Sequence, residues 1–282
     1  MLYQKQAFIV ENKQIAPAVY KLKADIPGLA GHLKAGQFLH LRIGESYDPL
    51  LRRPFSVYKI ENQKGNGRKL ICIIYKVIGR GTKILSQKTK GELLNVLGPL
   101  GNGFDFIGTG LKNRPVFLVA GGMGVAPLFF LASMMIKKTK PDFKKNVIIF
   151  IGSPNRQELV LTKEFDELGF KIQLSTDDGS RGFKGYVSEL LENYLKKKKV
   201  FPLRPYVYAC GPNNMLKALD ALAGKYRLDG QISVDKMMGC GVGACLGCVV
   251  KVKDNCNGQE AKYKRICKDG PVFKINEIIW ED

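Results

Sequence analysis

The sequence predicts an α+β protein of several domains: an antiparallel β-barrel, an α/β domain with a parallel sheet, and a small cysteine-rich segment. Short strands between turn residues fill residues 1 to about 108. Strands and helices alternate after that point, and five of the seven cysteines lie beyond residue 239. At about 100–200 residues per domain, the 282 residues suffice for two domains and a small third. We expect the boundaries at residues 1–110, 111–230 and 231–282.

The predicted barrel rests on short apolar runs separated by Gly, Pro and Asn, a pattern typical of small barrels and sandwiches. One run contains Cys72, which we therefore interpret as a small core residue. The runs are Ala7–Val10, Phe38–Ile43, Phe55–Tyr58 and Leu70–Val77, with turns at Gly65–Gly67 and Gly98–Gly103.

The α/β domain is predicted from strands and helices that alternate along the chain, as in a parallel sheet. The last ~50 residues are rich in Gly and Cys and too few for a core of their own, so we expect a cofactor to organise them. Strands are expected at Pro115–Ala120, Val147–Ile151, Lys171–Ser175 and Tyr206–Cys210, and helices at Ala126–Lys138, Glu164–Leu168, Val187–Lys198 and Met215–Ala223.

The formal charge of +20 allows nucleic acid, an anionic membrane or an acidic partner as a binding target. The run Lys196–Lys199 ends a helical pattern, as a solvated helix end would, and no nucleic-acid-binding motif accompanies it. An acidic protein partner or anionic cofactors explain the charge better. No apolar run is long enough to span a membrane, and Ala7–Val10 is too short for a signal-peptide core. We therefore expect a cytoplasmic protein that binds neither nucleic acid nor membrane.

Four cysteines are spaced as ligands of an iron–sulfur cluster. Cys240, Cys245 and Cys248 form C-x4-C-x2-C, and Cys267 follows after 18 residues, which is the plant-type 2Fe–2S spacing. Small residues between them let the loop wrap tightly and bring backbone N–H groups to the sulfurs. A zinc site usually has two C-x2-C pairs, of which one is present; free thiols are the other alternative. Cys256 lies in a polar stretch that predicts a hairpin turn and is not counted as a ligand.

Two turns at strand ends indicate a nucleotide site. The stretch Gly121–Pro127 follows a predicted strand and opens a helix, where glycines let the backbone approach a pyrophosphate. It differs from the common dinucleotide motif because Pro127 replaces the last glycine. Cys210–Pro212 ends another strand. Ligands gather at the carboxyl ends of strands in open α/β sheets, so we expect both turns at one site.

Two further patterns lie in the barrel half. Arg52–Tyr58 places an arginine, an aromatic residue and a serine on one strand, which could hold a phosphate, a ring face and a polar ring edge. The same residues are also compatible with an ordinary surface strand. Gly79–Lys83 follows a strand and could cap a short helix while holding a second phosphate.

Together these patterns resemble the ferredoxin–NADP reductase superfamily. The FAD-binding barrel of that superfamily carries R-x-[YF]-[ST], matched by Arg53–Ser56. Its α/β domain carries G-G-x-G-x-x-P, matched by Gly121–Pro127, and a C-G-P turn, matched by Cys210–Pro212. The segments Met238–Cys248 and Tyr263–Phe273 narrow the resemblance to the electron-transfer subunits of NAD-dependent dihydroorotate dehydrogenase B. The similarity covers the whole chain, and the cysteine segment is its most specific part.

The resemblance implies an oxidoreductase subunit of pyrimidine biosynthesis. A partner subunit, a TIM barrel with FMN, would oxidise dihydroorotate to orotate. Electrons would then pass one at a time through the 2Fe–2S cluster to FAD and leave as a hydride to NAD⁺. Two copies of each subunit would form a heterotetramer. The chain has no room for a TIM barrel of ~250 residues beside its own domains, so we expect no catalytic residue for orotate in it.

The resemblance also implies roles for single residues. Arg53 would hold the FAD pyrophosphate, and the cysteines of the C-terminal segment would hold the cluster. The expected FAD-binding residues are Arg53, Pro54, Phe55, Ser56, Ile74, Tyr75, Lys76, Gly81 and Thr82; the NAD side would be Gly121, Gly122, Gly124, Pro127, Cys210 and Gly211; the ligands would be Cys240, Cys245, Cys248 and Cys267.

Three alternatives stay open. The partner could be that of a ferredoxin:NADP oxidoreductase or a sulfide dehydrogenase, whose related subunits lack the C-G-x-G-A-C-L-G-C run. A non-enzymatic metal-binding or nucleic-acid adaptor would fit the charge, and a flavin spectrum would eliminate it. NAD is favoured over NADP on family grounds, although Ser153 and Arg156 follow a strand and could hold a 2′-phosphate.

Overall fold

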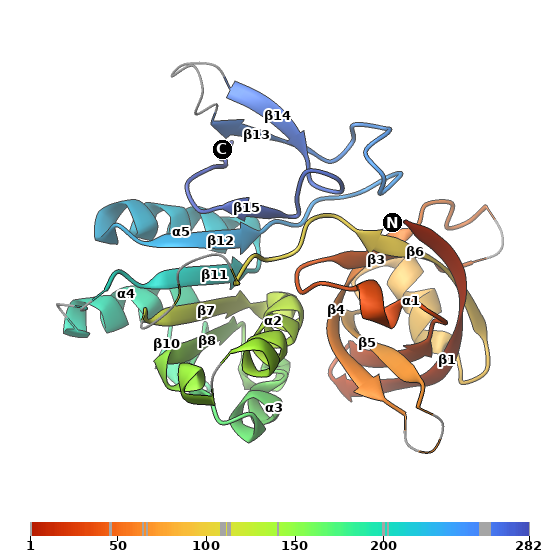
Figure 1. The fold of residues 1–282 in the computed structure, drawn as a ribbon, viewed down its shortest axis with the longest axis horizontal. Helices are drawn as coiled ribbons and strands as arrows, with labels where there is room; N and C mark the ends of the chain where they lie inside the picture. Colours follow the sequence, from red (N-terminus) through yellow and green to blue (C-terminus); the bar gives the residue numbers. More distant parts are fainter. Residues whose placement is uncertain are drawn as a thin grey trace.

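The computed structural model describes residues 2–44, 47–63, 65, 67–107, 111, 114–139, 141–198, 201, 203–253 and 261–281. In this part of the chain a β-barrel lies beside an α/β domain, and the C-terminal segment lies along the edge of the sheet (Figure 1). The predicted α+β class is confirmed. Over the same described ranges, none of the helices is long and apolar enough to cross a membrane.

Six antiparallel strands close into a barrel in the order β1-β2-β5-β4-β3-β6. Successive side chains of a strand point to opposite faces. In β3, Leu39 and Leu41 therefore fill the barrel core, while Phe38 and His40 point outward. The strands are β1 (Tyr3–Ala16), β2 (Val19–Asp25), β3 (Phe38–Arg42), β4 (Arg53–Asn62), β5 (Lys69–Lys76) and β6 (Leu93–Leu100); η1 spans Ala30–His32 and helix α1 spans Arg80–Gln87.

The α/β domain contains a seven-stranded sheet in the order β10-β9-β8-β7-β11-β12-β15. The first six strands of this order pair in parallel, and β15 joins antiparallel to β12. Strand β7 is buried along its whole length, as expected of a parallel strand covered on both faces. The strands are β7 (Val116–Gly121), β8 (Val147–Ser153), β9 (Lys171–Thr176), β10 (Phe183–Lys184), β11 (Tyr206–Cys210), β12 (Asp229–Ser233) and β15 (Val272–Lys274).

Helices cover both faces of this sheet. Helices α2 and α3 pack on the face that carries Leu118 and Ile149, whereas α4 and α5 pack on the face that carries Phe117 and Val119. The helices are α2 (Val125–Lys138), α3 (Thr162–Glu167), α4 (Val187–Lys198) and α5 (Asn213–Tyr226), with 3-10 turns η2 (Gly122–Gly124), η3 (Pro141–Asn146) and η4 (Arg156–Glu158).

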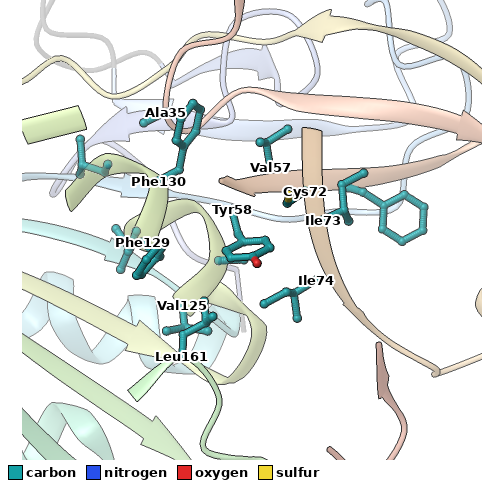
Figure 2. Close-up of a cluster of buried hydrophobic side chains, with 14 of the residues drawn as sticks. Ala35, Val57, Tyr58, Cys72, Ile73, Ile74, Val125, Phe129, Phe130 and Leu161 are labelled. Carbon is teal, nitrogen blue, oxygen red and sulfur yellow. The ribbon is translucent and has the colours of Figure 1, made fainter. Parts of the chain in front are cut away.

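An apolar seam joins the barrel to the α/β domain (Figure 2). Tyr58 of β4 and Ile74 of β5 face Val125 and Phe129 at the start of α2. The rings of Tyr58 and Phe129 are 5.9 Å apart, and Phe129 meets Phe165 of α3 edge-on at 5.0 Å. The barrel and the inner face of the sheet therefore share one hydrophobic core.

The C-terminal segment leaves the sheet after β12 and returns to it in β15. The antiparallel pair β13 (Val249–Lys253) and β14 (Ala261–Arg265) lies in between. We expected a cofactor to organise this segment, but Val252, Ile266 and Phe273 also join the hydrophobic core beneath α5. Strand β12 runs across residue 231, the boundary predicted from the sequence. Cys256 lies outside the described residues.

Candidate functional site

The four cysteines predicted as cluster ligands fall into two pairs. Cys240 and Cys245 hydrogen-bond to each other through their thiols, and Cys245 is exposed. The Sγ atoms of Cys248 and Cys267 are 3.2 Å apart, and both residues are buried. In the described part of the chain, no three potential ligands already converge on one point. Two pairs of thiols suit a 2Fe–2S cluster, in which four cysteines serve two irons.

Backbone N–H groups prepare the more exposed pair, Cys240 and Cys245, for metal binding; we call it the outer pair. The Cys240 Sγ accepts hydrogen bonds from the N–H groups of Val242, Ala244 and Cys245 at 3.3–3.4 Å. Burial opposes the thiolate, but these bonds outweigh it and lower the pKa of Cys240 to about 6. Burial, followed by the thiol of Cys248, raises the pKa of Cys267 to about 12. The thiolate is the ligand form, so Cys267, which belongs to the buried inner pair Cys248 and Cys267, must release its proton on binding metal.

An arginine and an aspartate that sequence reasoning missed hold the loop Cys240–Cys248, which we call the cluster loop. The Arg265 Nε donates to Asp269 Oδ2 at 2.9 Å, and its Nη1 donates to the Gly243 carbonyl at 3.2 Å. Asp269 also accepts the backbone N–H of Arg265 at 2.8 Å. The two residues therefore connect the turn that carries Cys267 to the loop that carries the other three cysteines. The sequence signal that could have identified them is an arginine and an aspartate four residues apart, one on each side of Cys267.

The cluster loop meets the barrel at His40 of β3. A Cβ added to Gly241 would lie 2.3 Å from His40 Nδ1, so only glycine permits this approach. Gly241 also has a φ of +72°, a conformation that favours glycine. Burial, and next the Arg52 guanidinium, lower the pKa of His40 to about 4. Sequence reasoning did not single out His40, although the chain has only two histidines.

The stretch Arg53–Ser56, which we call the flavin motif, begins with an arginine that lies beside helix α1, the helix that follows β5. A Cβ added to Gly81 would lie 3.0 Å from Arg53 Nε, so Arg53 and the N-terminus of α1 come together. The Thr82 Oγ1 accepts hydrogen bonds from the N–H groups of Ile78 and Gly79 at 3.0 and 3.2 Å. A guanidinium beside a helix N-terminus suits an anionic group such as a pyrophosphate.

The other predicted flavin residues separate between the two faces of the barrel wall. Pro54 and Ser56 pair with His40 and Phe38 and share their outward face. The rings of Phe55 and Tyr75 instead meet edge-on at 5.7 Å, both nearly fully buried. The Tyr75 hydroxyl donates to Asn12 Oδ1 at 3.0 Å.

The last two flavin candidates, Ile74 and Lys76, face the α/β domain. Ile74 lies in the apolar seam (Figure 2). Lys76 forms an ion pair with Glu158 at 2.6 Å. The structure therefore gathers Arg53, Gly81 and Thr82 at one point and disperses the other residues along the wall.

The two predicted nucleotide turns come together at the carboxyl ends of β7 and β11. A Cβ added to Gly124 would lie 2.0 Å from the Cys210 carbonyl oxygen, and one added to Gly211 would lie 3.0 Å from the backbone nitrogen of Gly121. Gly122 has a φ of +51°, and Pro127 is buried in the first turn of α2. The close packing of these turns leaves no room for a side chain at Gly121, Gly124 or Gly211.

Groups around this edge set its chemistry. Burial raises the pKa of the Cys210 thiol to about 12, against a hydrogen bond with Ser233 of β12, so this thiol is neutral near pH 7. Ser153, at the end of β8, donates to the Asn155 carbonyl at 2.7 Å and is buried. That hydroxyl is engaged within its own turn, whereas the neighbouring Arg156 is exposed.

A barrel with an arginine beside a helix N-terminus, a sheet with a glycine turn and a four-cysteine loop define an oxidoreductase that transfers electrons. Comparison with known families agrees. Residues 118–221 match the oxidoreductase NAD-binding domain. Residues 235–279 match the iron–sulfur cluster binding domain of dihydroorotate dehydrogenase B.

The chain is 37% identical to the dihydroorotate dehydrogenase B (NAD(+)) electron transfer subunit of Desulforamulus reducens, over 95% of each chain. It is 38% identical to the subunit of the same name from Geobacillus sp. strain WCH70, over 99% of this chain and 100% of that one. The chain therefore belongs to the family of dihydroorotate dehydrogenase B electron transfer subunits. The name of that family implies a separate catalytic subunit.

The chain also resembles a solved structure, that of an NADH-dependent reduced ferredoxin-NADP oxidoreductase studied for flavin-based electron bifurcation. The TM-score is 0.78 at 28% identity, over 97% of this chain and 90% of that one. The fold is thus common to more than one electron-transfer system, while the higher identities and the cluster domain identify this family. Together the matches and the fold support FAD, a 2Fe–2S cluster and NAD as cofactors.

Proposed function

We propose that this chain links the oxidation of dihydroorotate to orotate, performed by an FMN-containing partner subunit, to the reduction of NAD⁺ in pyrimidine biosynthesis. The observation that carries the proposal is the contact of the cysteine loop with the barrel, where Gly241 packs on His40 next to the flavin motif. Family membership supports the choice of substrate.

The cofactors supply the redox chemistry: a flavin exchanges hydride with a nicotinamide and single electrons with an iron–sulfur cluster. The chain supplies the binding and the spacing. Arg53 and the N-terminus of α1 bind the flavin pyrophosphate, and Thr82 holds that turn in shape. The glycine turn after β7 admits the dinucleotide backbone at the carboxyl edge of the sheet.

The cysteines are assigned as ligands in pairs. Cys240 and Cys245 would bind one iron, and Cys248 and Cys267 would bind the other, because each pair is already in contact. The outer pair lies toward solvent, so one edge of the cluster is open to a partner. The inner pair is buried against the core of the α/β domain.

Exposed apolar side chains flank the outer pair. Leu246 is 59% exposed and Met237 is 90% exposed. Apolar groups beside a solvent-facing ligand favour a protein partner at this surface, and we infer that the catalytic subunit docks here, in an assembly of two copies of each subunit. A cytoplasmic location is part of the proposal, because cysteines that bind iron must stay reduced until the metal arrives.

The decisive experiment is the reduction of orotate by NADH in the complex isolated anaerobically from its native cells. Activity that co-purifies with an FMN subunit would establish the proposal. If NADH reduces the flavin and the cluster but orotate is untouched, the electron-transfer chemistry stands and the partner is a different one, such as the ferredoxin system that the fold also fits.

A further inference from the structure

His40 lies between the flavin motif and the cluster loop. It stands opposite Pro54 of β4 on one side and opposite Leu97 of β6 on the other. Directly opposed residues of antiparallel strands share a face. The imidazole therefore rises from the outer face of the barrel between two apolar side chains. Gly241 packs on the ring, with Nδ1 as the atom nearest to it.

This imidazole is buried without a hydrogen-bond partner. It has no exposed surface, and neither Nδ1 nor Nε2 forms a hydrogen bond within the described residues. The backbone carbonyls of Arg52 and Cys240 are close enough to favour a proton on the ring, yet neither completes a hydrogen bond. Native proteins rarely leave buried donors unpaired, because such a group loses its bonds to water and gains none.

The partner of the ring is therefore a group that arrives with the cofactors. The side of the ring that faces the loop points toward the Cys240–Gly241 turn, where the loop has already given three N–H groups to the Cys240 sulfur. Loading would add sulfide to this turn and hold its cysteine sulfurs as metal-bound thiolates, and both kinds of sulfur accept hydrogen bonds.

We propose that His40 positions the iron–sulfur cluster on the barrel, and that a ring N–H donates a hydrogen bond to a sulfur of the loaded cluster. The proposal rests on the proposed function for the presence of a cluster, and not for the identity of the partner subunit. Hydrogen bonds to cluster sulfurs stabilise the added negative charge of the reduced state and raise the reduction potential. His40 thereby tunes the cluster from the strand that lies next to the flavin motif.

The first test is spectroscopic and uses the whole loaded protein labelled with ¹⁵N-histidine. The label enters only His32 and His40. Pulsed EPR of the dithionite-reduced cluster should show a weak ¹⁵N coupling that persists in His32→Gln and disappears in His40→Leu. A fully loaded, labelled wild-type protein without such a coupling overturns the proposal, and so does a coupling that disappears in His32→Gln.

The second test measures the potential of the cluster in the same variants. At a fixed ambient potential, the ratio of reduced to oxidised cluster should fall about tenfold in His40→Leu, equivalent to ~59 mV for a one-electron couple. His40→Gln keeps an N–H donor and should restore most of the ratio, while His32→Gln should leave it unchanged. Equal potentials in loaded His40→Leu and wild type would overturn the proposal.

The labelled wild-type protein decides the question even if His40→Leu fails to hold a cluster. Both readouts are independent of orotate. A failure of NADH to reduce orotate beside a clear ¹⁵N coupling would remove the assigned partner and leave His40 in its role. The absence of any coupling in a complex that reduces orotate would remove His40 from its role and leave the assigned partner in place.

Discussion

The barrel meets the rest of the chain at two places that differ in kind. Against α2, large rings pack in an apolar seam, with Phe129 only 3% exposed. Against the C-terminal segment, Phe38 and Leu100 of the barrel join the core around Phe273. Polar and main-chain contacts are added there: Asn102 Nδ2 donates to the Asp269 carbonyl at 3.0 Å, and Gly241 packs on His40. Burial of large apolar surface stabilises the folded chain, whereas close main-chain packing fixes the distance between the two segments that it joins. We infer that the first contact holds the domains together and the second sets the spacing of the cofactor sites.

The sharpest test of this division is the removal of one cluster ligand. Cys245→Ser should abolish the cluster, because four thiolates are needed, yet keep FAD and NADH–dye activity, because the apolar seam is untouched. Iron and sulfide analysis, the flavin spectrum and the dye assay measure the three properties. Cys256→Ser, a cysteine not counted as a ligand, is the matched control and should keep the cluster. Loss of FAD from Cys245→Ser would show that the cluster segment also holds the barrel.

A truncation in the apolar seam should instead lower the free energy of unfolding. Phe129→Ala removes a ring that contacts both Tyr58 and Phe165. Truncation of a buried phenylalanine costs about 3–5 kcal/mol of unfolding free energy, which urea unfolding of the loaded protein can measure. Ile107→Ala, at a side chain that is 72% exposed, should change it by less than about 0.5 kcal/mol. Similar losses in both variants would refute the seam as the main contact.

At the second contact, the cysteine next to Gly241 should be unusually reactive before the cluster is loaded. The lowered pKa of Cys240, about 6, means that its thiolate fraction rises about tenfold from pH 5 to pH 8 and is nearly complete at the upper end. Alkylation by iodoacetamide, followed by mass spectrometry of cluster-free protein, should rise over that range and level off. Cys267, with a pKa raised to about 12, should stay unmodified. A rate at Cys240 that still climbs tenfold per pH unit above pH 8 would contradict this.

The smallest effect is expected at Asn102. Asn102→Ala removes two exposed hydrogen bonds to the carbonyls of Lys268 and Asp269, each worth about 0.5–1.5 kcal/mol at most. The free energy of unfolding should therefore fall by about 1 kcal/mol, with the cluster content unchanged. A loss as large as that of Phe129→Ala would mean that this contact also carries stability, and the distinction between the two contacts would fail.

The features that sequence reasoning predicted are those with local patterns. The four cysteines were recognisable because a loop must space its ligands to wrap a cluster. The apolar runs of β5 and β7 and the glycine turn after β7 are likewise continuous stretches. The predicted strands and helices of the α/β half are present with small shifts at their ends.

The features that it missed depend on contacts between distant segments. The position of His40 follows from the pairing of β3 with β4 and from a loop two domains away. Motif matching also could not tell which face of the barrel wall a side chain occupies. The rings of Phe55 and Tyr75 pack together inside, and their place at the flavin stays a prediction. Strand β15 has only three residues, too short a run for periodicity to indicate.

Strand β15 gives the cluster segment an unexpected modularity. The chain departs from β12 and returns beside it, with Ser233 paired to Val272. Antiparallel neighbours can be joined by a turn of two residues, so everything between them amounts to an insertion into a hairpin. Such an insertion can be gained, lost or exchanged without cutting the sheet. A reductase fold could therefore gain or lose a cluster-binding segment at this edge without any change to its flavin and nucleotide sites.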